Sequence, residues 1–343
     1  MKKKSLNKPG MKINGNSFLL MVTVLLFIVM YAAGMVIFAD KGFAKPQMFL
    51  NLFISNAGLL VIAMGQTIVM ITGGIDISVG SVTALVCMLC AYDMEKKGMS
   101  AYMAVAIALL IGLLFGIVQG FLVSYLEIQP FIVSLAGMFF ARGMTSIVHT
   151  DPFNVQNEAF VKLKDTRVIV PGMGSVNRIG KYVNAYVEIG VIVAILIVVI
   201  MFVMLRWTKL GRSFYAVGGN RQSALMLGIN VKKTRFLAHL LSGLLAGIAG
   251  YVYFLHVGSG AATHASGMEM NAIASSIIGG TLLTGGVGNI IGTFFGVLSL
   301  STIQNIVSSA GLDQAWWTGI TIAAMLCLFL VIQSVVLARK KRK

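Results

Sequence analysis

RWTKLGRSFYAVGGNRQSALMLGINVKKTR, residues 206–235, separates two long apolar runs and sets the organisation of the chain. The stretch holds seven basic residues and no acidic one. Asn220 is a favourable helix N-cap, Arg221 to Leu227 can form about two helical turns, and Gly228 is a typical helix stop. A helix this short is marginal in water. Its apolar residues therefore need a surface to dock against; they are Ala224, Leu225 and Leu227. The sequence predicts either a capped helix that docks on a partner protein or a basic cytoplasmic loop that reports only membrane orientation.

Composition places the chain in a membrane. Hydrophobic residues make up 57% of the 343 residues and charged residues only 11%, whereas soluble domains contain about 25% charged residues. The net charge of +16 is spread between apolar runs, so membrane orientation explains it better than a nucleic-acid partner. Cys87, Cys90 and Cys327 all lie in apolar runs. Cys87 and Cys90 have the spacing of a redox motif but lack its βαβ context and polar flanks, so the pair is interpreted as packing.

The hydropathy pattern predicts an all-α polytopic membrane protein with about ten transmembrane helices. The first apolar run, from Phe18 to Phe38, is longer than the apolar region of a cleaved signal. The expected spans are roughly 17–39, 50–72, 77–92, 101–124, 130–148, 184–206, 236–256, 268–285, 290–309 and 316–337.

The distribution of basic residues predicts that both termini lie in the cytoplasm. Five lie near the N-terminus, seven in residues 206–235 and five at the C-terminus, against nine in the expected outer segments. Residues 1–343 are thus expected to form a single transmembrane domain. Its parts outside the membrane are a basic cytoplasmic N-terminus (1–16), an outer loop (149–183), the cytoplasmic loop (206–235) and a basic cytoplasmic tail (338–343).

Two features of the apolar regions predict structure beyond simple spans. Small residues recur at four-residue spacing, which lets helices approach closely in lipid; these are Gly112, Gly116 and Gly120, Gly243 and Gly247, and Gly292 and Gly296. A glycine-rich break follows the second span, at 73–81, and another follows much of the eighth span, at 279–286. Such paired breaks are typical of transporters with broken helices, although a glycine-rich chain can also produce them by chance. The outer loop forms either a small external cap that contacts a partner or a connector.

Polar residues within the spans are candidates for a solute pathway. Asp76 lies between two apolar spans, where it either caps the next helix together with Ser78 or faces a water-filled path. The full set of candidate pathway or broken-helix residues is Asn56, Gln66, Asp76, Ser78, Ser81, Glu269, Asn271 and Ser275. Amides, hydroxyls and carboxylates pair well with hydroxylated solutes, but they also satisfy neighbouring helices.

The sequence gives no sign of an enzyme. The four histidines lack metal-ligand spacing, no carboxylate pair lies at helical spacing within a span, and residues 174–181 depart from the phosphate-loop spacing. No catalytic residue, metal site or cofactor is therefore expected in this chain, and any nucleotide energy must come from another chain.

Three stretches resemble the permease subunits of bacterial ABC importers for sugars, of the ribose, xylose and galactoside type. They are GGIDISVGS (73–81), KLGRSFYAVGGNRQSALMLGINV (209–231) and EMNAIASSIIGGTLLTGGVGNIIGTFFG (269–296). Within that family, LAGMFFARG (135–143) and Trp316-Trp317-Thr318 look most similar to the second permease of galactofuranose-type importers.

The resemblance implies a protein of the bacterial cytoplasmic (inner) membrane that works with three partners: an ABC ATP-binding protein that carries ATP-Mg, an extracytoplasmic sugar-binding protein, and a second permease subunit. It also implies an ATPase-coupling loop made by Gly211, Arg212, Gly218, Gly219, Asn220, Ala224 and Gly228. Asn271 stands where the family usually has Asp, which alters any role of that acid here. Two alternatives stay open, an ion-coupled secondary transporter that uses Asp76 or Glu269, and an ABC permease for another small solute such as an amino acid.

Overall fold

The structure, a computed structural model, describes residues 15–176, 180–312 and 314–341. The predicted basic N-terminus thus lies almost wholly outside the described residues, as do the last two residues of the tail, whereas residues 338–341 are the end of helix α14. The helices are α1 (Gly15–Ile37), α2 (Pro46–Ile54), α3 (Ala57–Ile71), α4 (Val79–Lys97), α5 (Ala101–Ser124), α6 (Pro130–Val148), α7 (Glu158–Lys164), α8 (Ile189–Trp207), α9 (Lys209–Gly219), α10 (Arg221–Met226), α11 (Val231–Val257), α12 (Met268–Ile278), α13 (Ile290–Ser309) and α14 (Ala315–Lys341). The strands are β1 (Phe153–Asn154), β2 (Arg167–Val176), β3 (Tyr182–Glu188) and β4 (Ser259–Gly260).

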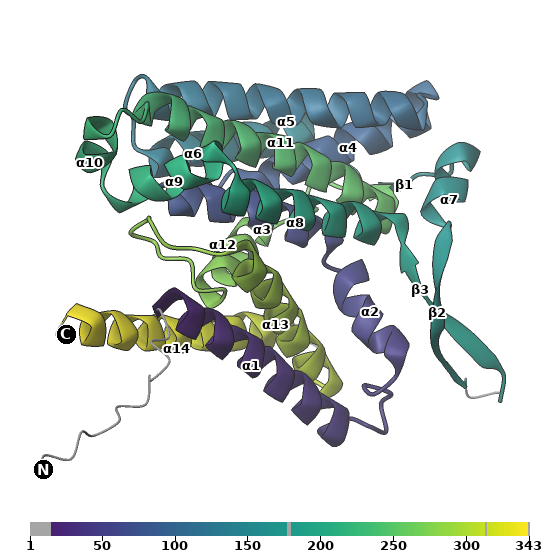
Figure 1. The fold of residues 1–343 in the computed structure, drawn as a ribbon. Helices are drawn as coiled ribbons and strands as arrows, with labels where there is room; N and C mark the ends of the chain where they lie inside the picture. Colours follow the sequence, from purple (N-terminus) through teal and green to yellow (C-terminus); the bar gives the residue numbers. More distant parts are fainter. Residues whose placement is uncertain (1–14, 177–179, 313, 342–343) are drawn as a thin grey trace, which may run out of the picture.

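Helix α3 lies at the centre of the bundle, and every one of its residues is buried. Its sequence is apolar around nearly the whole circumference, which is typical of a helix enclosed by other helices. It packs against α8, α11, α12 and α13. Helices α4, α5, α6, α8 and α11 form one layer, while α1, α13 and α14 lie together in a second group (Figure 1).

The glycine spacings mark close contacts between helix backbones, as predicted. A Cβ atom added to Gly112 of α5 would lie 2.5 Å from the carbonyl oxygen of Gly243 in α11. One added to Gly296 of α13 would lie 2.0 Å from the carbonyl oxygen of Ser275 in α12. Real Cβ atoms do not approach this closely, so only glycine allows these helix backbones to touch.

The number of long apolar helices is smaller than the predicted ten spans. Among the described residues, seven helices are long and apolar enough to cross a membrane: α1, α5, α6, α8, α11, α13 and α14. The pair α2 and α3 makes an eighth if its 53° bend lies within one span. Helix α4 is not apolar enough to count as a span, because its last turns carry Asp93, Glu95, Lys96 and Lys97. Helix α12 is too short, with 11 residues, because the chain leaves the helix at Gly279. The count of ten and the N-in, C-in orientation stay predictions.

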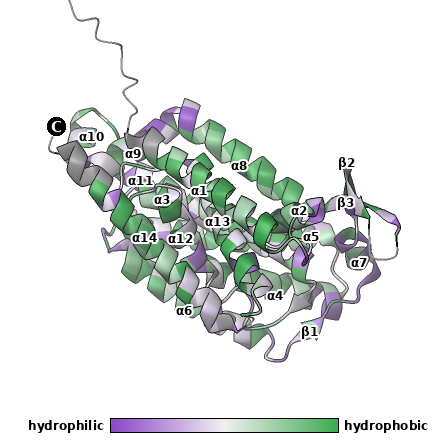
Figure 2. Ribbon diagram, turned by 90° about the horizontal axis from the view of Figure 1, so that it is seen from below, coloured by the Kyte–Doolittle hydropathy of each residue, from purple (hydrophilic) through white to green (hydrophobic). Residues whose placement is uncertain are grey.

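The predicted outer loop is folded. Strand β1 pairs with β4, β2 and β3 form an antiparallel hairpin, and the buried Phe160 of α7 stacks on Phe254 of α11 at 4.3 Å between ring centroids. Since β3 occupies residues 182–188, the predicted span 184–206 begins only at residue 189. Hydrophilic residues gather around α7, β1 and the hairpin, whereas α8 and α14 are hydrophobic along most of their length (Figure 2). The segment therefore forms a small folded cap, and its contact with a partner stays a prediction.

Candidate functional site

The stretch 206–235 contains two short helices, α9 and α10, rather than an open loop. Helix α9 follows α8 directly, because the Thr208 hydroxyl accepts a hydrogen bond from the Gly211 N–H at 3.1 Å and caps the new helix. A Cβ atom at Gly211 would lie 2.4 Å from the carbonyl oxygen of Leu205, so the tight turn requires glycine. The sequence analysis missed α9, although Thr208 is a favourable N-cap. Arg212, the other predicted coupling residue in this part, donates to the carbonyl of Trp207 at 3.3 Å.

The predicted short helix is confirmed as α10, one residue shorter than expected. The Asn220 side chain accepts a hydrogen bond from the Ser223 N–H at 2.8 Å. Gly228 adopts a φ of +76°, which side chains other than glycine rarely tolerate. The N–H of the next residue, Ile229, donates to the carbonyl of Ala224 at 3.0 Å, as in a Schellman stop.

The apolar residues of α10 divide between the protein and its surface. Ala224 is buried, so its predicted place on an uncovered face is wrong. Leu225, Met226 and Leu227 are 65%, 88% and 78% exposed. We call these three residues the apolar tip; they lie at the end of the molecule opposite to the β2–β3 hairpin (Figure 1).

Helix α9 joins α10 to both glycine-rich breaks through backbone contacts. A Cβ atom at Gly218 would lie 1.7 Å from the carbonyl oxygen of Ile71, the last residue of α3. The same carbonyl accepts a hydrogen bond from the Gly286 N–H at 2.8 Å, and a Cβ atom at Gly285 would lie 3.0 Å from Gly73. We call this meeting of Gly73, Gly218, Gly285 and Gly286 the glycine junction. By contrast, a Cβ atom at Gly219 would meet nothing within 4 Å.

Asp76 lies in the first break and is fully paired. Its Oδ1 accepts from the Ser78 N–H at 3.0 Å and from the Ser78 hydroxyl at 2.6 Å, and its Oδ2 accepts from Ser242 of α11 at 2.8 Å. Gln119 of α5 extends this network by donating to the Ser78 hydroxyl at 2.8 Å. Asp76 therefore binds the backbone just before α4 and ties it to α11, while the Ser78 side chain makes no cap hydrogen bond to the helix.

Several other predicted pathway residues are buried deep in the bundle. The Gln66 amide, the Ser275 hydroxyl and Glu269 Oε2 have no hydrogen-bond partner among the described residues. Glu269 packs directly against Gly80 of α4. A Cβ atom added to this glycine would lie 2.0 Å from Glu269 Oε2. Ser81, next to that glycine, is buried as well. Burying an unpaired polar group costs free energy, so these groups are unlike ordinary packing residues.

Asn56 and Asn271 meet in a polar cavity on the side of the bundle nearer the hairpin. This cavity, which we call the polar cavity, has a volume of about 300 Å³ and lies between the α2–α3 bend, α11, α13 and the segment before α12. Its lining is Ser55, Asn56, Leu59, Tyr253, Thr263, His264, Ala265, Ser266, Met268, Asn271 and Gln304. Asn56 is oriented by donating to Ser301 at 2.8 Å. The sequence analysis missed Tyr253, His264 and Gln304, since they lie far apart in the chain with no shared spacing.

His264 is the one titratable imidazole, ammonium, guanidinium or carboxyl group in that lining. Burial lowers its pKa, while a hydrogen bond to the backbone of Ser259 opposes this effect. The imidazole is therefore neutral at neutral pH, and the cavity presents amides, hydroxyls and aromatic faces without a formal charge.

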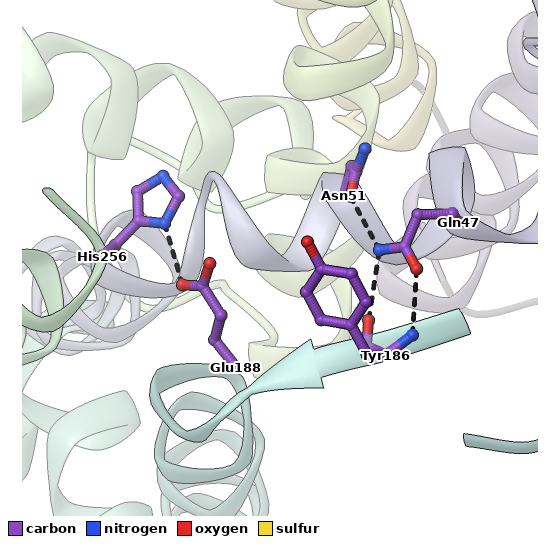
Figure 3. Close-up of polar contacts among 5 residues, drawn as sticks. All are labelled: Gln47, Asn51, Tyr186, Glu188 and His256. Atoms are coloured by element: carbon purple, nitrogen blue, oxygen red, sulfur yellow. Dashed lines mark hydrogen bonds and ion pairs between the residues drawn. The ribbon is translucent and has the colours of Figure 1, made fainter. Parts of the chain in front are cut away.

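Polar side chains fasten the hairpin to the bundle beside this cavity. Gln47 of α2 accepts from the Tyr186 N–H at 2.9 Å and donates to the Tyr186 carbonyl at 3.2 Å, in the manner of a neighbouring strand (Figure 3). Asn51 accepts from the same Gln47 amide at 2.9 Å. Glu188 at the end of β3 pairs with His256 of α11 at 2.9 Å.

Comparison with known proteins places this arrangement in a family. Residues 48–330 match the family model described as branched-chain amino acid transport system / permease component. The inner membrane ABC transporter permease protein YjfF of Escherichia coli is 36% identical over 92% of this chain and 91% of its own length. The fructose import permease protein FruG of Bifidobacterium longum is 35% identical over 96% and 95%. The ribose import permease protein RbsC of Bacillus subtilis is 36% identical over 80% and 81%. No solved structure matches the chain.

These matches confirm the resemblance drawn from residues 73–81, 209–231 and 269–296, and they give the protein a transport role rather than an enzymatic one. Together with the long apolar helices, they make it a multi-pass membrane protein. The chain belongs to the branched-chain amino acid transport system / permease component family.

Proposed function

We propose that the protein is the membrane-spanning permease of an ATP-driven importer that carries a sugar across the bacterial cytoplasmic membrane. The observation that carries this proposal is the apolar tip of α10, a capped helix whose exposed side chains are joined to both glycine-rich breaks through α9. The names of two similar proteins, a fructose and a ribose import permease, support a sugar as the solute.

The importer needs partners that supply energy and solute. ATP-Mg binds a separate ATPase chain that docks on the apolar tip, because three adjacent exposed apolar side chains favour burial against another protein. A sugar-binding protein delivers the solute at the opposite face, where the folded cap lies. A second permease subunit, either a copy or a paralogue as in galactofuranose-type systems, completes the path.

The glycine junction transmits the motion of the ATPase. Gly218 touches the end of α3, and Gly286 shares a hydrogen bond with that same end, so α9 cannot move without displacing both breaks. Tyr215 of α9 adds a further link by donating to the Gly288 carbonyl at 2.9 Å. Closure of the ATPase would thus shift α4 and α12 together and alternate access to the path.

The docking step is tested by placing a charge on the apolar tip. Met226→Asp should abolish co-purification of the ATPase and sugar uptake, because a carboxylate would be buried unpaired at the contact. Gln222→Asp adds the same charge to an exposed residue of the same helix and serves as the control. Unchanged assembly and uptake in Met226→Asp would refute docking through α10.

The polar cavity favours a sugar over an amino acid. An amino acid carries a carboxylate and an ammonium group, and each needs a charged or strongly polar partner when it leaves water. The cavity lining has no Asp, Glu, Lys or Arg, whereas its amides and hydroxyls pair with sugar hydroxyls and its tyrosine can stack on a sugar ring. Competition of labelled sugar uptake by unlabelled sugars and by leucine tests this choice, and inhibition by leucine alone would overturn it.

One experiment separates the importer from the ion-coupled alternative, in which Glu269 would serve as the coupling group. Glu269 is buried, and its Oε2 has no hydrogen-bond partner among the described residues. Uptake that persists in a strain without the ATPase, and that collapses on Glu269→Gln, would support an ion-coupled transporter. Uptake that stops without the ATPase supports the importer.

A further inference from the structure

A cavity of about 330 Å³ beside α10 plays no part in the coupling contacts described above. It lies between the α5–α6 connection, the start of α10 and the start of α11. The side chains of Arg221, Lys232 and Arg235 line it together with Ser124 and Glu127. We call it the basic cavity.

The charge around the basic cavity is positive. Three cations face one acid, Glu127, whose carboxylate lies 3.6 Å from the Lys232 ammonium. That pair is exposed on both sides, at 54% and 70% for the two side chains, and exposed pairs of this kind contribute little. The cavity therefore keeps an excess of positive charge that a bound anion would neutralise.

Arg235 and Ser124 are the two most buried polar side chains that line the basic cavity. Arg235 is only 7% exposed. Its guanidinium carries five N–H donors in a planar fork, a geometry that matches phosphate oxygens. The Ser124 hydroxyl is buried without a hydrogen-bond partner in the described part of the chain.

The backbone adds to the positive potential. Helices α6 and α11, of 19 and 27 residues, begin at Pro130 and Val231, and both of these residues line the cavity. The N-terminus of a helix carries a partial positive charge and free N–H groups, which favour anions. Lys232 and Arg235 are three residues apart on α11 and project from one side of it.

We propose that the basic cavity binds a phosphate group, held by the guanidinium of Arg235, the ammonium of Lys232 and the hydroxyl of Ser124. Arginine and lysine bind phosphate oxygens through charge-assisted hydrogen bonds. Basic pockets between membrane helices bind the headgroups of anionic lipids, and the apolar residues Phe121, Tyr125 and Leu126 next to the cavity are exposed where acyl chains would lie. A soluble phosphate offers the same chemistry, and this binding depends on neither ATPase docking nor transport.

The test compares two adjacent lysines of α11. The full chain is reconstituted in nanodiscs of phosphatidylcholine with and without phosphatidylglycerol, and bound lipid is quantified by mass spectrometry after transfer to detergent. Wild type should retain phosphatidylglycerol, and Lys232→Gln should retain about fivefold less, the loss expected for one lysine near an anionic headgroup. Lys233→Gln, which removes an exposed charge outside the cavity, should retain as much as wild type.

Two further arms decide the source of the phosphate and the role of Arg235. In phosphatidylcholine alone, broadening of the inorganic phosphate resonance by wild type but not by Lys232→Gln would identify soluble phosphate as the ligand. Arg235→Lys should keep part of the binding that Arg235→Gln loses; if the glutamine variant does not fold, the Lys232 and Lys233 pair still decides. Equal losses in Lys232→Gln and Lys233→Gln, or no retained phosphate from either source, would overturn the proposal.

Discussion

The two ends of the molecule are built on different principles. At the α10 end, backbone contacts made possible by Gly218, Gly285 and Gly286 hold α9 against both breaks, and the Tyr215 side chain adds one hydrogen bond. At the hairpin end, side chains make the connections, through Gln47 to β3 and through His256 to Glu188 (Figure 3). The first end exposes an apolar tip, whereas the second encloses the polar cavity.

This difference matches two mechanical tasks. Backbone contacts without flexible side chains transmit a displacement with little loss, since packed interiors yield poorly to compression. Side-chain hydrogen bonds can exchange partners with a solute or with water at small net free energy, which suits a place where a solute enters and leaves. The comparison therefore predicts that substitutions which add side-chain volume reduce stability and uptake most at the α10 end. Substitutions that remove polar groups should reduce uptake most at the hairpin end.

Gly218→Ala should have the largest effect, because its Cβ atom would overlap the carbonyl of Ile71 at 1.7 Å. Overpacking of this kind costs about 1–3 kcal/mol or more, and relief would require α9 to leave the junction. Gly219→Ala is the matched control, since it has open space and should change stability by less than about 0.5 kcal/mol. Thermal unfolding in detergent and sugar uptake measure the pair, and equal behaviour of the two variants would contradict the glycine junction.

Ser242→Ala tests the connection between the first break and α11. It leaves Asp76 Oδ2 buried without its donor, which should cost about 1.5–3 kcal/mol, as for hydrogen bonds to charged groups. Ser299→Ala removes a hydroxyl that is equally buried but has no partner among the described residues, so it should be neutral or slightly stabilising. Thermal unfolding compares them, and an equal loss in both would mean that Asp76 does not depend on Ser242.

Gln304→Ala tests whether the polar cavity at the hairpin end binds the solute. Loss of one neutral hydrogen bond to a sugar should raise the half-saturation concentration for uptake about two- to tenfold, with little change in stability. Asn305→Ala removes the same kind of side chain from the next residue of α13, which does not line the polar cavity. Similar uptake by the two variants would place the solute elsewhere.

The α10 end was more predictable than the hairpin end because its signals are local. Asn220 and Gly228 bound a short helix through hydrogen bonds within a few residues, so sequence alone indicates both limits. The glycine pairs at 73–74 and 285–286 were visible as breaks, but their meeting at α9 depends on tertiary packing that no spacing encodes. Strands β2 and β3 pair antiparallel, and hydropathy alone does not distinguish such a pair from an irregular connector.

The functional residues divide in the same way. Asp76 and Ser78 bind each other two residues apart in the first break, whereas Gln119 and Ser242 join them from α5 and α11. Each of these two helix residues has apolar or small neighbours on both sides, and the sequence does not indicate which residue it contacts. The structure divides the predicted set into three groups and one remaining residue. Asp76 and Ser78 bind each other in the first break, Gln66, Glu269 and Ser275 are buried with atoms unpaired among the described residues, Asn56 and Asn271 line the polar cavity, and Ser81 is buried.

The smallest expected effect concerns acid sensitivity at the hairpin end. Burial lowers the pKa of His264, so as the pH falls the unfolded chain, with an ordinary histidine pKa near about 6.5, takes up a proton before the folded protein does. The contribution of His264 to stability is thus complete above pH ~6.5 and is lost as the pH falls towards the lowered value. His264→Gln should reduce the drop in apparent Tm between pH 7.5 and 5.5, because glutamine keeps a polar contact without titrating. Gln304→Ala changes the same cavity without removing a titrating group, so it should keep the wild-type acid sensitivity. If His264→Gln also keeps the wild-type drop in apparent Tm, the loss of stability in acid comes from other groups, and the polar cavity tolerates a charged imidazole.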